Sequence, residues 1–239
     1  MVILGSYFDL GYLIKSFPII LSYVHTTILI TFVATMIGIL LGSVVALIRI
    51  NKIVVLDKIA AVYISFIRGT PFLVQLFLVY FGLPELLQKL GYQGIREIPA
   101  LFYVFIVFSL HVGAYIGEII RSGILAVDKG QLEAAYAIGM GTIQAYTRII
   151  LPQAFSMAIP AICNTVISTL KGTSLVFNVG VIDMMRKADL MGANSHRSLE
   201  LYIDVAIIYV ILVFLLSALS TFLEKKMSNV SIGMGGDSL

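Results

Sequence analysis

The chain has 239 residues, of which 59% are hydrophobic and only 12% are charged, and its net charge at pH 7 is +3. Soluble domains carry about 25% charged residues, so this chain has too few charges to cover a soluble globule, and a lipid bilayer is the expected surrounding. The basic residues are spread between apolar runs. This distribution argues against nucleic acid as a partner, because nucleic-acid-binding proteins gather their basic residues on one face.

Five apolar runs are long enough to cross a bilayer. A membrane-spanning helix needs about 20 mostly apolar residues. The runs that meet this requirement are residues 16–48, 59–83, 98–117, 152–170 and 205–223. The second run is interrupted by Arg68 and by a Gly-Thr-Pro breaker at residues 69–71, where proline frees a backbone carbonyl that needs another partner. These runs predict an all-α membrane protein with five transmembrane helices, whose membrane domain spans residues 16–227.

Basic residues between the runs predict the orientation of the chain. Those that follow the first, third and fifth spans are Arg49, Lys52, Lys58, Arg121, Lys129, Arg148, Lys225 and Lys226. The positive-inside rule assigns these segments to the cytoplasm. The opposite loops carry fewer basic residues, namely Lys89, Arg96, Arg186, Lys187 and Arg197. Because the number of spans is odd, we expect residues 1–15 to be an extracytoplasmic N-terminal segment and residues 228–239 to be a flexible cytoplasmic tail.

A polar stretch rich in alanine and glycine separates the third and fourth runs. Its sequence, EAAYAIGMGTIQAY, begins at Glu133 and predicts a short helix with glycine breaks. Glu133 suits the N-terminal end of a helix, and Gly139 lets the backbone turn. The small side chains of Ala134, Ala135 and Ala137 leave a surface on which another protein could pack closely. An ordinary amphipathic connector between two spans is the alternative interpretation.

The spacing of residues in and after this stretch resembles a known family signature. The pattern is E-A-A, then G after three residues, then I-x-L-P after nine more, at Glu133, Ala134, Ala135, Gly139, Ile149, Leu151 and Pro152. It resembles the signature of ATP-binding-cassette (ABC) importer permeases. The segments FIRGTPFLVQLFLVYFGLP, GAYIGEIIRSGILAVDKGQLEAA and LKGTSLV are similar to the polar amino acid branch of that family, of the glutamine, histidine and cystine type. The resemblance covers residues 16–227.

The resemblance implies the type I ABC importer permease fold, with a cytoplasmic coupling helix between the third and fourth spans. In this family the coupling helix sits in a cleft of a separate ATPase subunit. When two ATPase subunits close over ATP, they draw two coupling helices together, and the membrane bundle changes from inward-open to outward-open. Glu133 would then be a polar contact to the ATPase, and Gly139 would make the turn.

The same resemblance implies the partners of the chain. They are a dimer of ATPase subunits, a second permease copy that is identical or related, and an extracytoplasmic substrate-binding protein, assembled at the inner membrane of a bacterium. The chain lacks the G-x-x-x-x-G-K-[ST] run that cradles phosphates in ATPases. ATP and Mg²⁺ would therefore be bound by the partner ATPase, and we expect no cofactor, metal site or catalytic residue in this chain.

Polar side chains inside the predicted spans are candidates for substrate contact, because such groups are costly in lipid. Those on the third and fourth spans are Ser109, His111, Tyr115, Asn164, Thr165, Ser168 and Thr169. The alternative is that these hydroxyls and amides only hydrogen-bond between helices. Glu118 and Arg121, one helical turn apart, are expected to form a structural ion pair. Arg68 is expected to support the broken second span rather than to bind substrate.

The resemblance also bears on the substrate. Permeases of this family that take basic amino acids carry an acidic side chain at the position of Thr165. The hydroxyl of Thr165 therefore disfavours arginine, lysine and histidine. A zwitterionic amino acid such as cystine or glutamine would suit a site lined by hydroxyls and amides.

Two other classes of function are alternatives for such a chain. A stand-alone secondary amino acid transporter would need no docking helix for an ATPase, so copurification of an ATPase subunit discriminates the two. An intramembrane enzyme would require paired catalytic groups at membrane depth. His25, His111 and His196 do not have a metal-ligand spacing such as H-E-x-x-H. The enzyme interpretation is therefore weak.

Overall fold

The computed structural model describes residues 8–92 and 97–233, with side chains up to residue 227, and these residues form helices and contain no strand. The elements are α1 (Leu10–Leu21), α2 (Val24–Ile50), α3 (Val54–Gly69), α4 (Phe72–Phe77), a π turn (Leu78–Gly82), α5 (Leu83–Lys89), α6 (Ala100–Ala126), α7 (Lys129–Ala137), α8 (Thr142–Ala145), a second π turn (Tyr146–Ile150), α9 (Leu151–Gly172), a 3₁₀ helix (Thr173–Val179), α10 (Met184–Ser195) and α11 (Ser198–Gly233).

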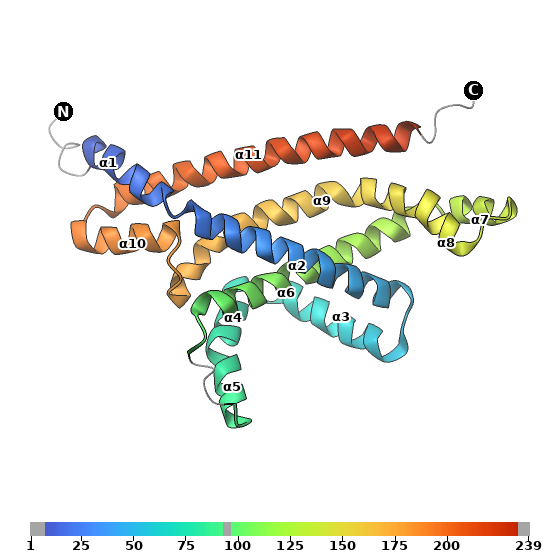
Figure 1. Ribbon diagram of the computed structural model, residues 1–239, viewed down its shortest axis with the longest axis horizontal. Helices are drawn as coiled ribbons and strands as arrows, with labels where there is room; N and C mark the ends of the chain where they lie inside the picture. Colours follow the sequence, from blue (N-terminus) through green and yellow to red (C-terminus); the bar gives the residue numbers. More distant parts are fainter. Residues whose placement is uncertain (1–7, 93–96, 234–239) are drawn as a thin grey trace.

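Five of the described helical segments are long and apolar enough to cross a membrane. They are Val24–Ile50, Phe72–Lys89, Ala100–Ala126, Thr142–Val179 and Ser198–Met227. The prediction of an all-α protein with five such helices is confirmed. The long helices α2, α6, α9 and α11 run lengthwise through the molecule (Figure 1). Helices α7 and α8 lie at one end, together with the α2–α3 connection and the C-terminal end of α11, whereas α1 and α10 lie at the other end (Figure 1).

Glycines allow α2 and α6 to pack against each other at short range. Gly38 and Gly42 on α2 are four residues apart, as are Gly113 and Gly117 on α6, so each pair lies on one face of its helix. A Cβ atom on Gly42 would lie 2.8 Å from the backbone nitrogen of Gly117 and 3.0 Å from the carbonyl oxygen of Gly113. Small residues at this spacing let helix backbones approach closely in membranes. These four glycines form what we call the α2–α6 seam. Next to it lies a buried apolar cluster that includes Ile30 of α2 and Phe108 of α6.

The first predicted span is not one helix. The structure divides the expected run 16–48, because α1 ends at Leu21 and α2 begins at Val24. Polar side chains at this point compete with the helix for backbone groups. Ser22 Oγ donates to the carbonyl oxygen of Ile19 at 2.7 Å, and His25 Nδ1 lies 2.7 Å from the carbonyl oxygen of Ser22.

The second predicted span, 59–83, is also wrong as a single helix. Helix α3 ends at Gly69, and the chain is extended at Thr70 and Pro71 before α4 begins at Phe72. The residue before a proline is pushed out of the helical region, and proline has no N–H to continue the helix. After this break, α4 and α5 turn away from the long helices (Figure 1). The long apolar segment therefore starts after the breaker, at Phe72.

Helices α6 and α11 continue beyond the ends predicted for the third and fifth spans. Helix α6 continues to Ala126 instead of ending at residue 117, so Glu118 and Arg121 lie within it. Helix α11 continues to Gly233, inside the segment 228–239 that was expected to be a flexible tail. Residues 1–7 of the expected N-terminal segment and residues 234–239 of the tail lie outside the described residues.

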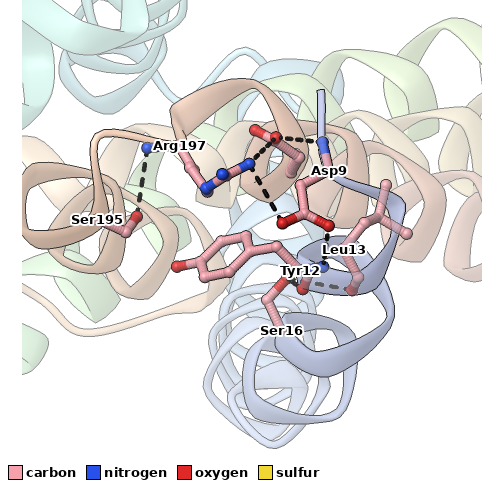
Figure 2. Close-up of polar contacts among 7 residues, drawn as sticks. Asp9, Tyr12, Leu13, Ser16, Ser195 and Arg197 are labelled. Carbon is pink, nitrogen blue, oxygen red and sulfur yellow. Dashed lines mark hydrogen bonds and ion pairs between the residues drawn. The ribbon is translucent and has the colours of Figure 1, made fainter. Parts of the chain in front are cut away.

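A polar cluster ties α1 to α11 at the end of the molecule opposite α7 and α8 (Figure 2). The backbone N–H of Asp9 donates to Glu200 Oε1 at 2.8 Å. Arg197 Nη1 lies 3.3 Å from Glu200 Oε1 and 3.4 Å from Asp9 Oδ2. Further along both helices, Ser16 Oγ donates to Asp204 Oδ2 at 2.6 Å. Since Glu200 and Asp204 are buried, removing a partner from either carboxylate would leave a costly buried charge.

Candidate substrate cavity and α7–α8 segment

A first cavity of about 350 Å³ opens between α4, α6 and α9. It is lined by Phe72, Phe108, His111, Tyr115, Asn164, Thr165, Ser168, Thr169, Gly172 and Leu175. This set contains six of the seven polar residues named from the sequence. Ser109 is the exception, because it is only 3% exposed and does not line this cavity. The structure therefore brings His111, Tyr115 and the polar face of α9 together and separates Ser109 from them.

Helical spacing explains why these residues meet. His111 and Tyr115 are four residues apart on α6, so both point to one side of that helix. On α9, Asn164 and Ser168 form one such pair, and Thr165 and Thr169 form another. Two polar faces from different helices therefore meet across the cavity.

The hydroxyls and the amide of α9 differ in what they bind. Thr165 Oγ1 donates to the carbonyl oxygen of Ala161, and Thr169 Oγ1 donates to that of Thr165, both at 2.8 Å. Both donors are thus satisfied within α9. The side chains of Asn164 and Ser168 are exposed, and no described residue hydrogen-bonds to them. Among the described residues of α9 that line the first cavity, these two keep their side-chain hydrogen-bond donors free to bind a solute.

The electrostatics of the first cavity are close to neutral. Among the described residues that line it, none is a carboxylate, lysine or arginine. Its aromatic wall is a row of rings in which the His111 ring lies 4.8 Å from Phe72 and 4.9 Å from Tyr115, measured between centroids. Beyond Tyr115, the guanidinium carbon of Arg68 lies 5.7 Å from the ring centroid. The cavity can thus offer hydrogen bonds and ring faces, but no full charge, to a solute.

A second cavity of about 360 Å³ shares Tyr115 with the first cavity as a lining residue. Arg68 at the end of α3, Glu118 on α6 and Met157 on α9 are among its walls. Arg121 Nε donates to Glu118 Oε2 at 2.9 Å, so the predicted ion pair is present. Arg68 is exposed at the break after α3, and its guanidinium lies over the ring of Tyr115.

The α7–α8 segment, residues 129–145, contains the first part of the sequence signature, from Glu133 to Gly139. Asp128 caps α7 by accepting a hydrogen bond from the backbone N–H of Gly130 at 2.6 Å. The helix ends at Ala137, and Gly139, just after its C-cap Ile138, has a left-handed φ of 81°. The N–H of Gly139 donates to Tyr136 and that of Met140 donates to Ala135, both at 3.0 Å. These two hydrogen bonds together form a Schellman motif, whose left-handed residue explains why glycine is favoured at position 139.

The surface of the α7–α8 segment is not the alanine surface that was expected from the sequence. Ala135 is only 1% exposed, so the expectation that it belongs to an outer packing surface is wrong. Glu133, Ala134 and Ala137 are exposed as expected. The largest apolar groups on the surface here are Ile138, which is 78% exposed, and Ile143, which is 80% exposed.

The last part of the signature connects this segment to α9. Ile149 packs against a buried cluster of Val127, Ile150 and Ala154, while Leu151 and Pro152 are half-buried in the first turn of α9. Because Pro152 has no N–H, the carbonyl four residues earlier loses its helical partner. The chain accommodates this with the π turn Tyr146–Ile150, in which the N–H of Leu151 donates to Tyr146. Ile149, Leu151 and Pro152 therefore fix the α7–α8 segment against the start of α9.

Residues 35–229 match the protein family described as the binding-protein-dependent transport system inner membrane component. The chain belongs to this family. It is 38% identical over 225 residues to "Probable amino-acid ABC transporter permease protein PatM" of Vibrio harveyi, covering 94% of this chain and 99% of that protein. It is 40% identical over 220 residues to "L-cystine transport system permease protein TcyL" of Bacillus subtilis, covering 92% of this chain and 91% of that protein.

A solved structure is similar to the permease over nearly its whole length. It is described as "Crystal structure of an amino acid ABC transporter with histidines", with 36% sequence identity and a TM-score of 0.82, covering 92% of this chain and 99% of that chain. The fold is therefore the type I ABC importer permease fold, and the predicted family is confirmed. The relative PatM and this solved structure are both named as amino-acid ABC transporters, and neither is named as a stand-alone secondary transporter.

Two features of the permease were not found from its sequence. Gln75 of α4 is buried and hydrogen-bonds to His111 of the first cavity. The sequence did carry a signal for Gln75, since it is a polar residue inside an apolar run, four positions after Pro71. A polar residue inside a membrane span is by itself a candidate functional residue. The exposure of Ile138 and Ile143 carried no such signal, because isoleucine in a membrane protein is ordinarily assigned to lipid or to the core.

Proposed function

We propose that this permease forms part of the translocation path of an ATP-driven importer for a zwitterionic amino acid, with cystine or glutamine as the leading candidates. The observation that carries this proposal is the first cavity. Its polar groups are an imidazole, a phenol, an amide and hydroxyls, and no carboxylate is among its described lining residues. A cationic side chain would be desolvated there without an opposite charge, which is costly.

The volume of the first cavity, the name of one relative and the residue at position 165 support the same proposal. A volume of about 350 Å³ falls at the small end of ligand sites, about 300 to 1,000 Å³, and is suited to a single amino acid. The relative TcyL is named for L-cystine transport. Thr165, whose hydroxyl lines the cavity, stands where the family resemblance puts an acidic residue in permeases for basic amino acids.

The proposal includes energy coupling through the α7–α8 segment. Ile138 and Ile143 are large apolar side chains that are almost fully exposed at one end of the molecule, beside the exposed carboxylate of Glu133. An apolar centre with a charged rim is the usual composition of a protein interface. The partner is an ATPase subunit that binds ATP and Mg²⁺, since the chain has no phosphate-binding run of its own.

The orientation and the remaining partners complete the proposal. The α2–α3 connection, the α7–α8 segment and the end of α11 share one end of the molecule (Figure 1), and their basic residues favour the cytoplasm. Helix α1 and α10 then face the outside, where a substrate-binding protein delivers the amino acid. A second permease copy, identical or related, completes the path, and each copy contacts one subunit of an ATPase dimer.

The test is uptake by cells that carry the whole transporter and lack other importers for the same solutes. Labelled cystine, glutamine and arginine are offered separately, and the ATPase is copurified through a tag on the permease. We expect uptake of cystine or glutamine that depends on the ATPase, and little uptake of arginine. Preferential uptake of arginine would contradict the substrate assignment. Uphill transport by the permease alone in liposomes would contradict the coupling.

A further inference from the structure

Gln75 is a buried amide whose orientation is determined by its surroundings. It is 3% exposed and lies on α4, just after the break at Thr70 and Pro71. The two hydrogens of its Nε2 face three acceptors, with one hydrogen shared: the carbonyl oxygen of Ile67 at 2.7 Å, the carbonyl oxygen of Thr70 at 3.0 Å and Thr70 Oγ1 at 2.9 Å. The two carbonyl oxygens can only accept, so the amino group of the amide must face them. The amide oxygen consequently faces the opposite way.

The amide oxygen of Gln75 determines which nitrogen of His111 carries a proton. Gln75 Oε1 lies 3.1 Å from His111 Nδ1. An amide oxygen can only accept a hydrogen bond, so Nδ1 must be the donor. The hydrogen-bonding partner of one ring nitrogen thus sets the chemistry of the other. In the neutral ring, Nε2 has no proton and presents a lone pair.

The His111 ring is held so that it forms part of the first cavity wall. Phe72 meets it edge to face, with centroids 4.8 Å apart, and Tyr115 packs against it at 4.9 Å. No described residue hydrogen-bonds to Nε2, and the side chain lines the first cavity. None of the described lining residues is a carboxylate that would pair with an imidazolium. A neutral ring with a free Nε2 lone pair is the form that this wall accommodates.

We propose that Gln75 is a positioning residue that holds His111 in its Nδ1-protonated form, so that Nε2 accepts a hydrogen bond from the ammonium group of the transported amino acid. The inference rests on the proposed function and specifies how a cavity without a carboxylate binds an ammonium group. That group has three N–H donors. His111 Nε2 accepts one of them from the α6 wall, and the amide oxygen of Asn164 accepts another from the α9 wall, which lines the same cavity.

The break in the second span thereby acquires a role in the site. The carbonyl oxygens of Ile67 and Thr70 are left without helical partners by the Gly-Thr-Pro breaker. Gln75 donates hydrogen bonds to both carbonyl oxygens, and its amide oxygen is thereby directed toward His111 Nδ1. A polar residue in this position therefore serves both the backbone of α3 and the wall of the cavity.

The tautomer is tested by nitrogen-15 NMR of the assembled transporter labelled on histidine. The permease has three histidines, and His111→Asn identifies the signals of His111 by their loss. We expect a protonated Nδ1 and an unprotonated Nε2. Gln75→Met keeps the volume of the side chain but removes the acceptor, so His111 should become a mixture of tautomers. A protonated Nε2 in the wild type, or an unchanged His111 spectrum in Gln75→Met, would overturn the assignment.

The acceptor role is tested by uptake kinetics of two His111 variants in the same complex. His111→Asn retains a donor toward Gln75 but has no acceptor at the position of Nε2, whereas His111→Gln can place an amide oxygen there. We expect His111→Asn to raise KM about tenfold, or about 1.4 kcal/mol, which is within the range of a hydrogen bond to a charged group. His111→Gln should recover part of the affinity, and copurification of the ATPase should stay normal in both variants.

A matched control is His25→Asn, because His25 lies at the α1–α2 junction outside the first cavity, and its KM should equal that of the wild type. A wild-type KM in His111→Asn, with normal amino acid uptake, would overturn the present inference alone. If the wild-type transporter takes up no amino acid, the proposed function is wrong, and the ammonium-acceptor role is wrong with it.

Discussion

The α2–α6 seam and the α7–α8 segment both depend on glycine, but for different physical reasons. At Gly42 in the seam there is no room for a Cβ atom, since backbone atoms of α6 lie 2.8 and 3.0 Å from its position. At Gly139 in the α7–α8 segment nothing lies within 4 Å of such an atom, and it is the positive φ that disfavours other residues. The glycines of the seam are packed against residues of the same chain. The α7–α8 segment, in contrast, exposes Ile138 and Ile143 to its surroundings. Substitutions should therefore affect folding in the first region and binding in the second.

The largest effect is expected for Gly42→Ala. The added methyl group would meet the backbone of Gly113 and Gly117, which cannot move aside without separating the helices. We expect a loss of about 3 kcal/mol, the upper part of the range for overpacking, measured as a lower thermal midpoint in detergent. Gly82→Ala is the matched control, because nothing lies within 4 Å of that position. Equal stability of the two variants would contradict the proposed importance of the close contact.

Ile143→Asp should leave the fold intact and weaken ATPase binding. The side chain is 80% exposed, so its replacement removes little packing within the chain. If it is a central contact, we expect a cost of about 2 kcal/mol, or roughly thirtyfold in affinity, measured by copurification and titration with the ATPase. Leu190→Asp on α10 makes the same type of change at the other end of the molecule and should bind the ATPase normally. Lower stability with normal binding in Ile143→Asp would remove this contact from the interface.

Gly139→Ala tests whether the left-handed turn matters for coupling. A non-glycine residue at φ 81° costs about 1 to 2 kcal/mol. We expect the end of α7 to relieve this strain by rearranging locally, which should weaken ATPase binding about fivefold and leave the unfolding of the membrane helices unchanged. Gly139→Asn should be milder, because asparagine tolerates this conformation better than other residues. Identical binding by the alanine variant, the asparagine variant and the wild type would show that the turn can rearrange.

The smallest effect is expected for Glu133→Gln. Glu133 is exposed at the rim of the α7–α8 segment, where a charged pair with a partner contributes about 0.2 to 1 kcal/mol. We expect ATPase affinity to fall by less than a factor of five at low salt, and the difference to vanish at high salt. A loss that persists in high salt would indicate a buried contact instead of a rim contact.

Much of the fold was accessible from the sequence because it depends on local properties. A run of apolar residues of sufficient length predicts a membrane helix wherever it packs, which is why five spans could be counted. The first two runs are nevertheless divided, after Leu21 and after Gly69. The signature residues Glu133 and Gly139 likewise carried the family assignment. The bounds were less accurate: helix α6 extends to Ala126 and α11 to Gly233. Apolarity indicates how much chain fits in lipid, whereas a helix continues for as long as its backbone bonds are satisfied.

The sequence by itself determined the class of fold, the family and the polar faces of α6 and α9, since a helical period places residues four apart on one side. Only the tertiary structure decided that these two faces meet in one cavity, that Ser109 is excluded from it and that Ala135 points inward. It alone connected Gln75 to His111 across 36 positions of sequence. The physical reason is that burial and hydrogen bonding between distant residues depend on which helices pack together, and that arrangement follows from close contacts such as the glycine seam.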